Sequence, residues 1–206
     1  MRGENKVSVK FRRGFCYLIG LFILAVGITF TIISNLGAGA WDALSVGLSV
    51  RFGLTVGTWV ILIGVILIIV NALIAWSRPE IHSLLTVIIL GYFIDFWLLI
   101  VFQDIRLNEL PVQAAVLLSG VTLMGLGIST YLQADFAIIP IDRLMLNLKQ
   151  LLRLPLMGAK TVAEIIALVA ALLVGGPIGV GTIIVTLSIG PLIQVFYKRV
   201  KRIVSV

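Results

Sequence analysis

Four acidic side chains stand in or beside stretches of this 206-residue sequence that are otherwise apolar. Asp42 and Asp142 each open a short, more polar segment that follows a long apolar one, whereas Asp95 and Glu164 fall inside apolar stretches. A carboxylate in such surroundings is costly unless it binds a proton, a cation or a polar solute. These four residues are therefore the first candidates for a binding site.

Glu164 ranks first among them, because it falls about halfway along an apolar stretch and should lie near the middle of a membrane. Arg143 is the expected charge partner, although Lys160, one helical turn before Glu164, could instead form a static ion pair with it. Weaker candidates for the same site are Asn35, Asp135 and Trp41.

The residue types argue against enzyme chemistry. His82 is the only histidine, so no metal cluster or catalytic triad built on histidine can form. The sequence also has no Gly-rich phosphate-binding loop of the P-loop type. We therefore predict no enzyme and expect neither a cofactor nor a metal; a membrane enzyme working with carboxylates alone is the minor alternative.

The elements that must position these residues are membrane helices. Hydrophobic residues make up 60% of the chain and charged residues 12%, whereas a soluble domain is about half apolar and about a quarter charged. A membrane span needs about 20 predominantly apolar residues. Six such stretches leave no room for a soluble domain: 14–34, 56–76, 83–102, 112–133, 157–174 and 180–197.

The net charge of +7 follows membrane topology. If both termini are cytoplasmic, all of the 16 Lys and Arg residues except Arg51 and Arg106 lie on the inner side, as the positive-inside rule requires. Within the clusters of basic residues only Phe11 separates two of them, whereas a groove for single-stranded nucleic acid would need aromatic residues interleaved with basic ones along its length. We expect a multi-pass membrane protein, with cytoplasmic termini and with lipid, not nucleic acid, as its partner.

The chain also resembles itself at an offset of 100 residues, where residues 20–44 fall on residues 120–144. Each half contains three spans, so the second half must cross the membrane in the opposite sense to the first. This predicts an all-α protein of two inverted three-helix repeats, about 14–102 and 112–200, within a single membrane domain (1–206). The matched positions are Gly20 with Gly120, Gly27 with Gly127, Asn35 with Asp135, Asp42 with Asp142 and, after small shifts, Gly57 with Gly158 and Gly91 with Gly190.

A short segment follows the first span of each half, at 37–52 and 137–153. Each segment is too short for a span and is long enough for a helix of about three turns, either interfacial or re-entrant. Asp42 or Asp142 would then lie in the first turn, where a carboxylate suits the positive end of the helix. The alternative, that a broken backbone and a carboxylate form a binding site between the repeats, stays open beside this structural explanation.

Small residues and aromatic residues in the spans point to packing and to the membrane boundary. The two glycine pairs of the first and fourth spans recur every seven residues, which predicts a close contact between these spans. Tyr17 and Tyr131 lie near span ends, where aromatic rings commonly settle at the level of the lipid headgroups.

Several motifs resemble a known family. "LGAGAWDALSVGLS", "ILGYFIDFWL", "PIDRLM" and "GGPIGVGT" are similar to the YczE/YyaS/YitT family of bacterial integral membrane proteins, over essentially the whole chain. The family's Gly-Pro-Trp-Asp element lacks its proline here, because Ala40 stands in that position. The resemblance implies a polytopic protein of the bacterial inner membrane and says little about mechanism.

Two functions from different classes remain open. The first is a small-solute transporter or permease with a polar site at the repeat interface, working alone or as a homodimer. The second is a non-transporting membrane accessory or scaffold, or a substrate-capturing subunit that serves a partner ATPase. Architecture alone does not decide between them.

Overall fold

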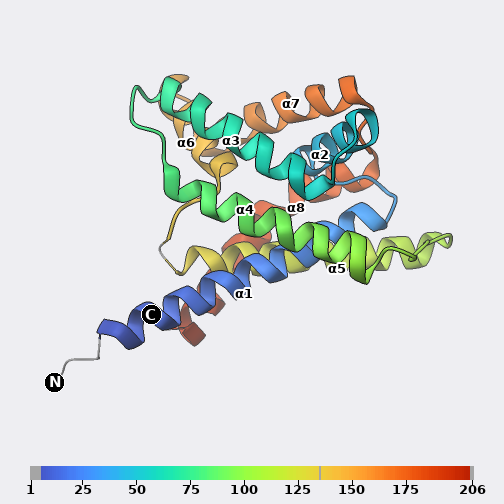
Figure 1. Cartoon of the computed structure of the whole chain (residues 1–206), viewed down its shortest axis with the longest axis horizontal. Coiled ribbons are helices and arrows are strands. Elements are labelled where there is room, and N and C mark those ends of the chain that lie inside the picture. Colours follow the sequence, from blue (N-terminus) through green and yellow to red (C-terminus); the bar gives the residue numbers. More distant parts are fainter. Residues whose placement is uncertain (1–5, 135, 205–206) are drawn as a thin grey trace.

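The chain is built from helices. The computed structural model describes residues 6–134 and 136–204, and eight α-helices and one π-helical turn, η1, form its regular structure there (Figure 1). These elements are α1 (Lys6–Ile33), α2 (Ala40–Phe52), α3 (Val56–Ile74), α4 (Ile81–Phe96), η1 (Trp97–Val101), α5 (Leu110–Leu132), α6 (Pro140–Leu151), α7 (Leu156–Val174) and α8 (Val180–Val204).

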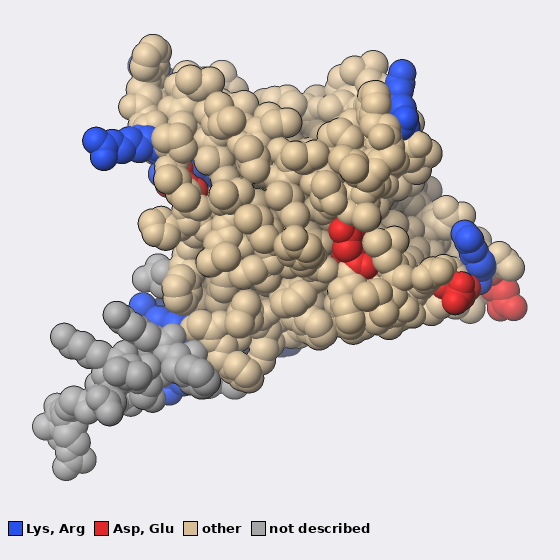
Figure 2. Space-filling model, in the orientation of Figure 1, with Lys and Arg blue, Asp and Glu red and all other residues tan. Residues whose placement is uncertain are grey.

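Six of these helices, α1, α3, α4 with η1, α5, α7 and α8, are long and apolar enough to cross a membrane. They confirm the six predicted spans to within a few residues at most ends. Successive long helices run in opposite directions, so the first and last helices begin and end at the same end of the molecule (Figure 1). Figure 2 shows a broad face of neutral side chains with charged ones mainly near its two ends, as a lipid-facing surface requires. Which end is cytoplasmic stays a prediction from the basic residues.

The centre of the fold is an antiparallel contact between α1 and α5, where the predicted glycines meet. A Cβ atom on Gly27 would lie 2.6 Å from the backbone nitrogen of Met124, and one on Gly127 would lie 2.8 Å from the carbonyl oxygen of Gly20. The two backbones can approach so closely only because these side chains are absent. The predicted contact between the first and fourth spans is confirmed.

The two short segments predicted after these helices are helices too. Asn35 adopts a left-handed conformation (φ 58°) just after α1, and α2 begins five residues later. Pro140 is the first residue of α6, where a missing N–H costs nothing; Ala40 holds the same place in α2. By connectivity, α2 lies at the end where α1 ends and α6 lies at the opposite end (Figure 1).

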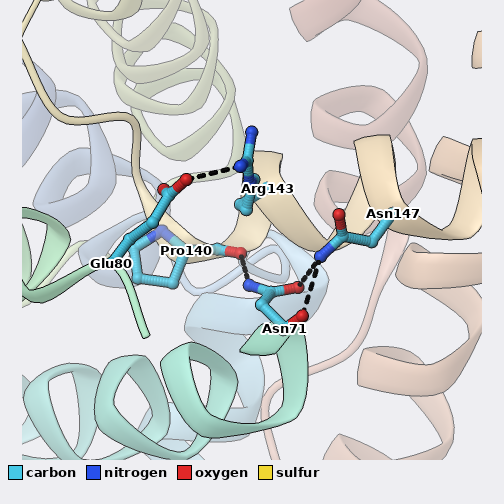
Figure 3. A network of polar contacts seen from close by, with 5 residues as sticks. All are labelled: Asn71, Glu80, Pro140, Arg143 and Asn147. Carbon is cyan, nitrogen blue, oxygen red and sulfur yellow. Dashed lines mark hydrogen bonds and ion pairs between the residues drawn. The ribbon is translucent and has the colours of Figure 1, made fainter. Parts of the chain in front are cut away.

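Each short helix packs against the third helix of the other half: α2 against α7, and α6 against α3. A polar network strengthens the second of these contacts (Figure 3). The buried Asn71 side chain of α3 donates a hydrogen bond to the Pro140 carbonyl oxygen (2.9 Å), and its own Oδ1 accepts one from Asn147 Nδ2 (3.0 Å). The start of α6 is therefore held on α3 by hydrogen bonds between buried groups.

Replacing Asn71 by leucine is expected to lower the free energy of unfolding by about 1–2 kcal/mol, because the buried Pro140 carbonyl would lose the Asn71 amide and Asn147 would keep only its longer bond to the backbone carbonyl of residue 71. Thermal unfolding of the purified protein in detergent measures this loss. The control is Glu80→Gln: the Glu80–Arg143 ion pair spans 2.5 Å, but its side chains are 41% and 37% exposed, so its loss should cost under about 1 kcal/mol. An Asn71→Leu variant as stable as the control variant would contradict this account.

Candidate functional site

A cavity of about 510 Å³ lies between α7 and α8, and all eight α-helices contribute residues to its lining. This volume falls within the range of about 300–1,000 Å³ typical of small-molecule sites. Most of the lining is apolar, with Ile63, Leu90, Met124 and Val185 among the buried residues of the wall. A solute inside would therefore contact apolar side chains over most of its surface.

Four of the eight candidate residues line this cavity: Glu164 of α7, Asp42 and Trp41 of α2, and Asp142 of α6. The first turns of both short helices thus face the same space from opposite ends of the molecule. Both aspartates lie in a first turn, as the helix-start explanation predicts, and both also line the cavity, so the two explanations do not exclude each other. Lys160, one turn before Glu164, joins them in the lining.

The Asp42 carboxylate lies over Gly39, where a Cβ atom would come within 2.9 Å of Oδ2. Burial, and to a smaller extent the nearby Glu164 carboxylate, raise the pKa of Asp42 to about 7. The side chain is still partly accessible, because it borders the cavity.

Asp142 is held differently, although its position in the short helix is the same. Its carboxylate accepts a hydrogen bond from the Tyr131 hydroxyl (2.9 Å). Burial raises the pKa of Asp142, while the Tyr131 hydrogen bond and the charge of Lys160 oppose that rise. Asp142 is thus the better stabilised of the two aspartates in its ionised form.

Several polar groups at the cavity have no hydrogen-bond or ion-pair partner. Within the described ranges, no hydrogen bond or ion pair reaches the carboxylates of Asp42 and Glu164. The indole Nε1 of Trp41 is buried and also lacks a hydrogen-bond partner. Buried polar groups are nearly always paired in proteins, so unpaired groups around one cavity point to a binding role.

The remaining candidates lie elsewhere. Arg143 pairs with Glu80 and not with Glu164 (Figure 3), because its side chain leaves α6 in a different direction from that of Asp142. Asp95 accepts hydrogen bonds from the Thr55 hydroxyl (2.5 Å) and the Gly57 backbone N–H (2.7 Å), and so joins α4 to the start of α3. Asn35 is exposed at the end of α1, and Asp135 lies outside the described residues.

Two of the tyrosines near the span ends, Tyr17 and Tyr131, face the interior of the protein and not lipid. Tyr131 is 2% exposed and Tyr17 is 6% exposed, and their rings contact each other edge to face with centroids 6.4 Å apart. A sequence signal existed: Tyr131 follows Gly127 by four residues and Tyr17 precedes Gly20 by three, so each tyrosine lies on the packed face of its helix. Tyr131 thereby reaches Asp142.

The two helix pairs that correspond in the predicted repeat differ in their packing. Between α3 and α4 the backbones meet closely, and a Cβ atom on Gly91 would lie 2.6 Å from the Gly57 carbonyl oxygen. The matched glycines of α7 and α8 do not meet: the nearest atom to a Cβ on Gly190 would be Lys160 Nζ at 3.8 Å, and Gly158 faces only residues just before it. Over the described residues α7 and α8 hardly touch, and the cavity fills the space between them.

Comparison with known proteins agrees with the motifs. The family of unknown function DUF6198 matches residues 11–198. The chain is 42% identical to "Uncharacterized protein YyaS" of Bacillus subtilis (strain 168), over 90% of this chain and 92% of that protein. It is 35% identical to "Uncharacterized membrane protein YczE" of the same strain, over 86% and 82% of the two chains. The resemblance to YyaS and YczE is thereby confirmed.

A more distant relative, "Uncharacterized protein" of Haemophilus influenzae (strain ATCC 51907 / DSM 11121 / KW20 / Rd), is 27% identical over 90% of this chain and 84% of that protein. No solved structure is significantly similar to the chain.

Proposed function

We propose that this chain, which belongs to the DUF6198 family, is a small-solute transporter. That family is a multi-pass membrane protein family with bacterial members and no established function. The role of the chain must therefore be argued from its own cavity. The observation that carries this proposal is one cavity that holds Glu164 and the first-turn carboxylates of both short helices. Transporters commonly bind substrate where broken helices of two repeats meet near the membrane midplane.

The packing of the helices supports the inverted repeat on which this proposal draws. Under the offset of 100 residues, α1 to α4 correspond to α5 to α8. The contact of α2 with α7 then corresponds to that of α6 with α3, and the contact of α1 with α4 to that of α5 with α8. Each short helix thus packs on the other half of the chain, which supports a cavity formed jointly by the two halves.

The difference in packing between the pair α3–α4 and the pair α7–α8 supports a conformational change during transport as well as solute binding. A transporter with inverted repeats reaches its second state when each half adopts the conformation of the other. Here α3 packs on α4 through Gly57 and Gly91, while α7 and α8 stand apart. In the second state α7 would close on α8 through Gly158 and Gly190, and α3 would part from α4.

Solute flux through the purified protein tests this function. The protein alone, reconstituted in liposomes, is expected to increase the uptake of at least one solute from a panel of amines, amino acids, sugars and carboxylates, relative to protein-free liposomes. Flux from the purified chain would argue against the accessory role. Folded protein that moves no solute in the panel, and that recovers flux when a partner ATPase is added, would support that alternative instead.

A further inference from the structure

We infer that the cavity between α7 and α8 binds an organic cation with an apolar body. This inference deepens the proposed function by naming the class of solute, but binding itself can be measured without transport. Its first support is the balance of charge. The charged residues of the lining are Asp42, Asp142, Glu164 and Lys160, so carboxylates outnumber ammonium groups by three to one.

The protein itself neutralises little of this negative charge. The Lys160 ammonium lies near both Asp142 and Glu164, and the Tyr131 hydroxyl adds a hydrogen bond to Asp142. Asp42 and Glu164 are left without an ion pair or hydrogen bond among the described residues. Since one lysine can balance only one carboxylate, a cation is the complement that the cavity lacks.

The remaining lining selects an organic cation over an inorganic one. In the part of the chain that the structure describes, no three His, Cys, Asp or Glu side chains are close enough to hold a metal ion together. A hard metal ion needs about six oxygen ligands, whereas the cavity offers walls such as Ile63, Leu90 and Met124. An apolar body would cover these walls.

Trp41 adds a group suited to the same ligand. It lies beside Asp42 in the chain and lines the cavity, and the face of an indole ring attracts cations at close range. An anion would meet three carboxylates, and a neutral apolar solute would leave them unpaired. The charge of the lining and its largely apolar character therefore both favour an organic cation with an apolar body.

The test uses two probes of nearly equal size and opposite charge, tetraphenylphosphonium and tetraphenylborate. Equilibrium dialysis measures their binding to the full-length protein in lipid nanodiscs, with protein-free nanodiscs as the background. Saturable binding of tetraphenylphosphonium alone is expected. A variant that combines Asp42→Asn with Glu164→Gln should bind it at least about tenfold more weakly, since two opposite charges are lost.

The matched control is Asp95→Asn, which removes a carboxylate from an apolar stretch outside the cavity and should leave the binding of tetraphenylphosphonium unchanged. Equal saturable binding of tetraphenylborate, or unchanged cation binding by the double variant, would overturn the inference. Cation binding without flux would leave the inference standing and count against the transporter. Flux of a neutral or anionic solute without cation binding would support the transporter and overturn the inference.

Discussion

Glu164→Gln is expected to reduce solute flux at least about tenfold without unfolding the protein. Glutamine keeps the shape and the hydrogen-bonding capacity of glutamate but removes its charge. Glu164 lies about halfway along α7 and faces the cavity, where a charge that contacts the solute or a coupling proton is worth more than it would be in water. Initial flux rates in proteoliposomes, at equal amounts of inserted protein, measure the loss.

Two measurements separate this loss from a folding defect. The melting temperature of the variant should match that of the unmodified protein or exceed it, because no ion pair or hydrogen bond to Glu164 is broken within the described residues. Asp95→Asn provides the comparison, because it removes a carboxylate outside the cavity that does accept hydrogen bonds, from Thr55 and Gly57; its melting temperature should fall, whereas that of Glu164→Gln should not. Full flux in Glu164→Gln would remove Glu164 from the site.

The second large effect is expected from a covalent link between α7 and α8. A variant carrying Gly158→Cys and Gly190→Cys, with Cys16→Ser to remove the natural thiol, should form a disulfide under mild oxidation and then lose most of its flux. The two positions stand apart in this structure. Because a disulfide needs Cα atoms within about 7 Å, its formation would report a state in which α7 closes on α8.

Reduction of that disulfide should restore the flux, which distinguishes trapping from damage. A control variant keeps Gly158→Cys but carries the second cysteine at Val195 instead of Gly190. The Val195 side chain is 46% exposed and points away from Gly190 on α8, so this variant should not cross-link. Failure of the Gly158–Gly190 pair to cross-link, or full flux in the cross-linked protein, would show that the space between α7 and α8 does not close.

Local patterns predicted the elements of this fold well. Apolar length predicted the six spans, and the spacing of Gly20 and Gly27 predicted the contact with α5, because both signals depend on neighbouring residues. The short helices followed from a proline or small residues placed before an aspartate. Each of these signals can be found in residues that lie within a few helical turns of one another in the sequence.

The site was predictable only in part, because it depends on partners distant in sequence. Arg143 and Asp142 are adjacent, but side chains of adjacent helical residues point about 100° apart, and Arg143 reaches Glu80 instead of the cavity. Asp95 likewise meets Thr55, 40 positions earlier. The role of Tyr131 depended on which face of α5 is buried, and the repeat in its glycines carried that information.

The contact between α1 and α5 also bears on how such a chain can change during evolution. Along this contact a single methyl group on Gly27 or Gly127 would collide with backbone atoms, which cannot move aside. The wall of the cavity is different, since exchanges among leucine, isoleucine, valine and methionine of similar volume cost little stability. Selection for a new solute can therefore act on the wall residues while the two central helices stay the same. A frame of this kind lets the lining of the cavity change while the helices that hold it stay in place.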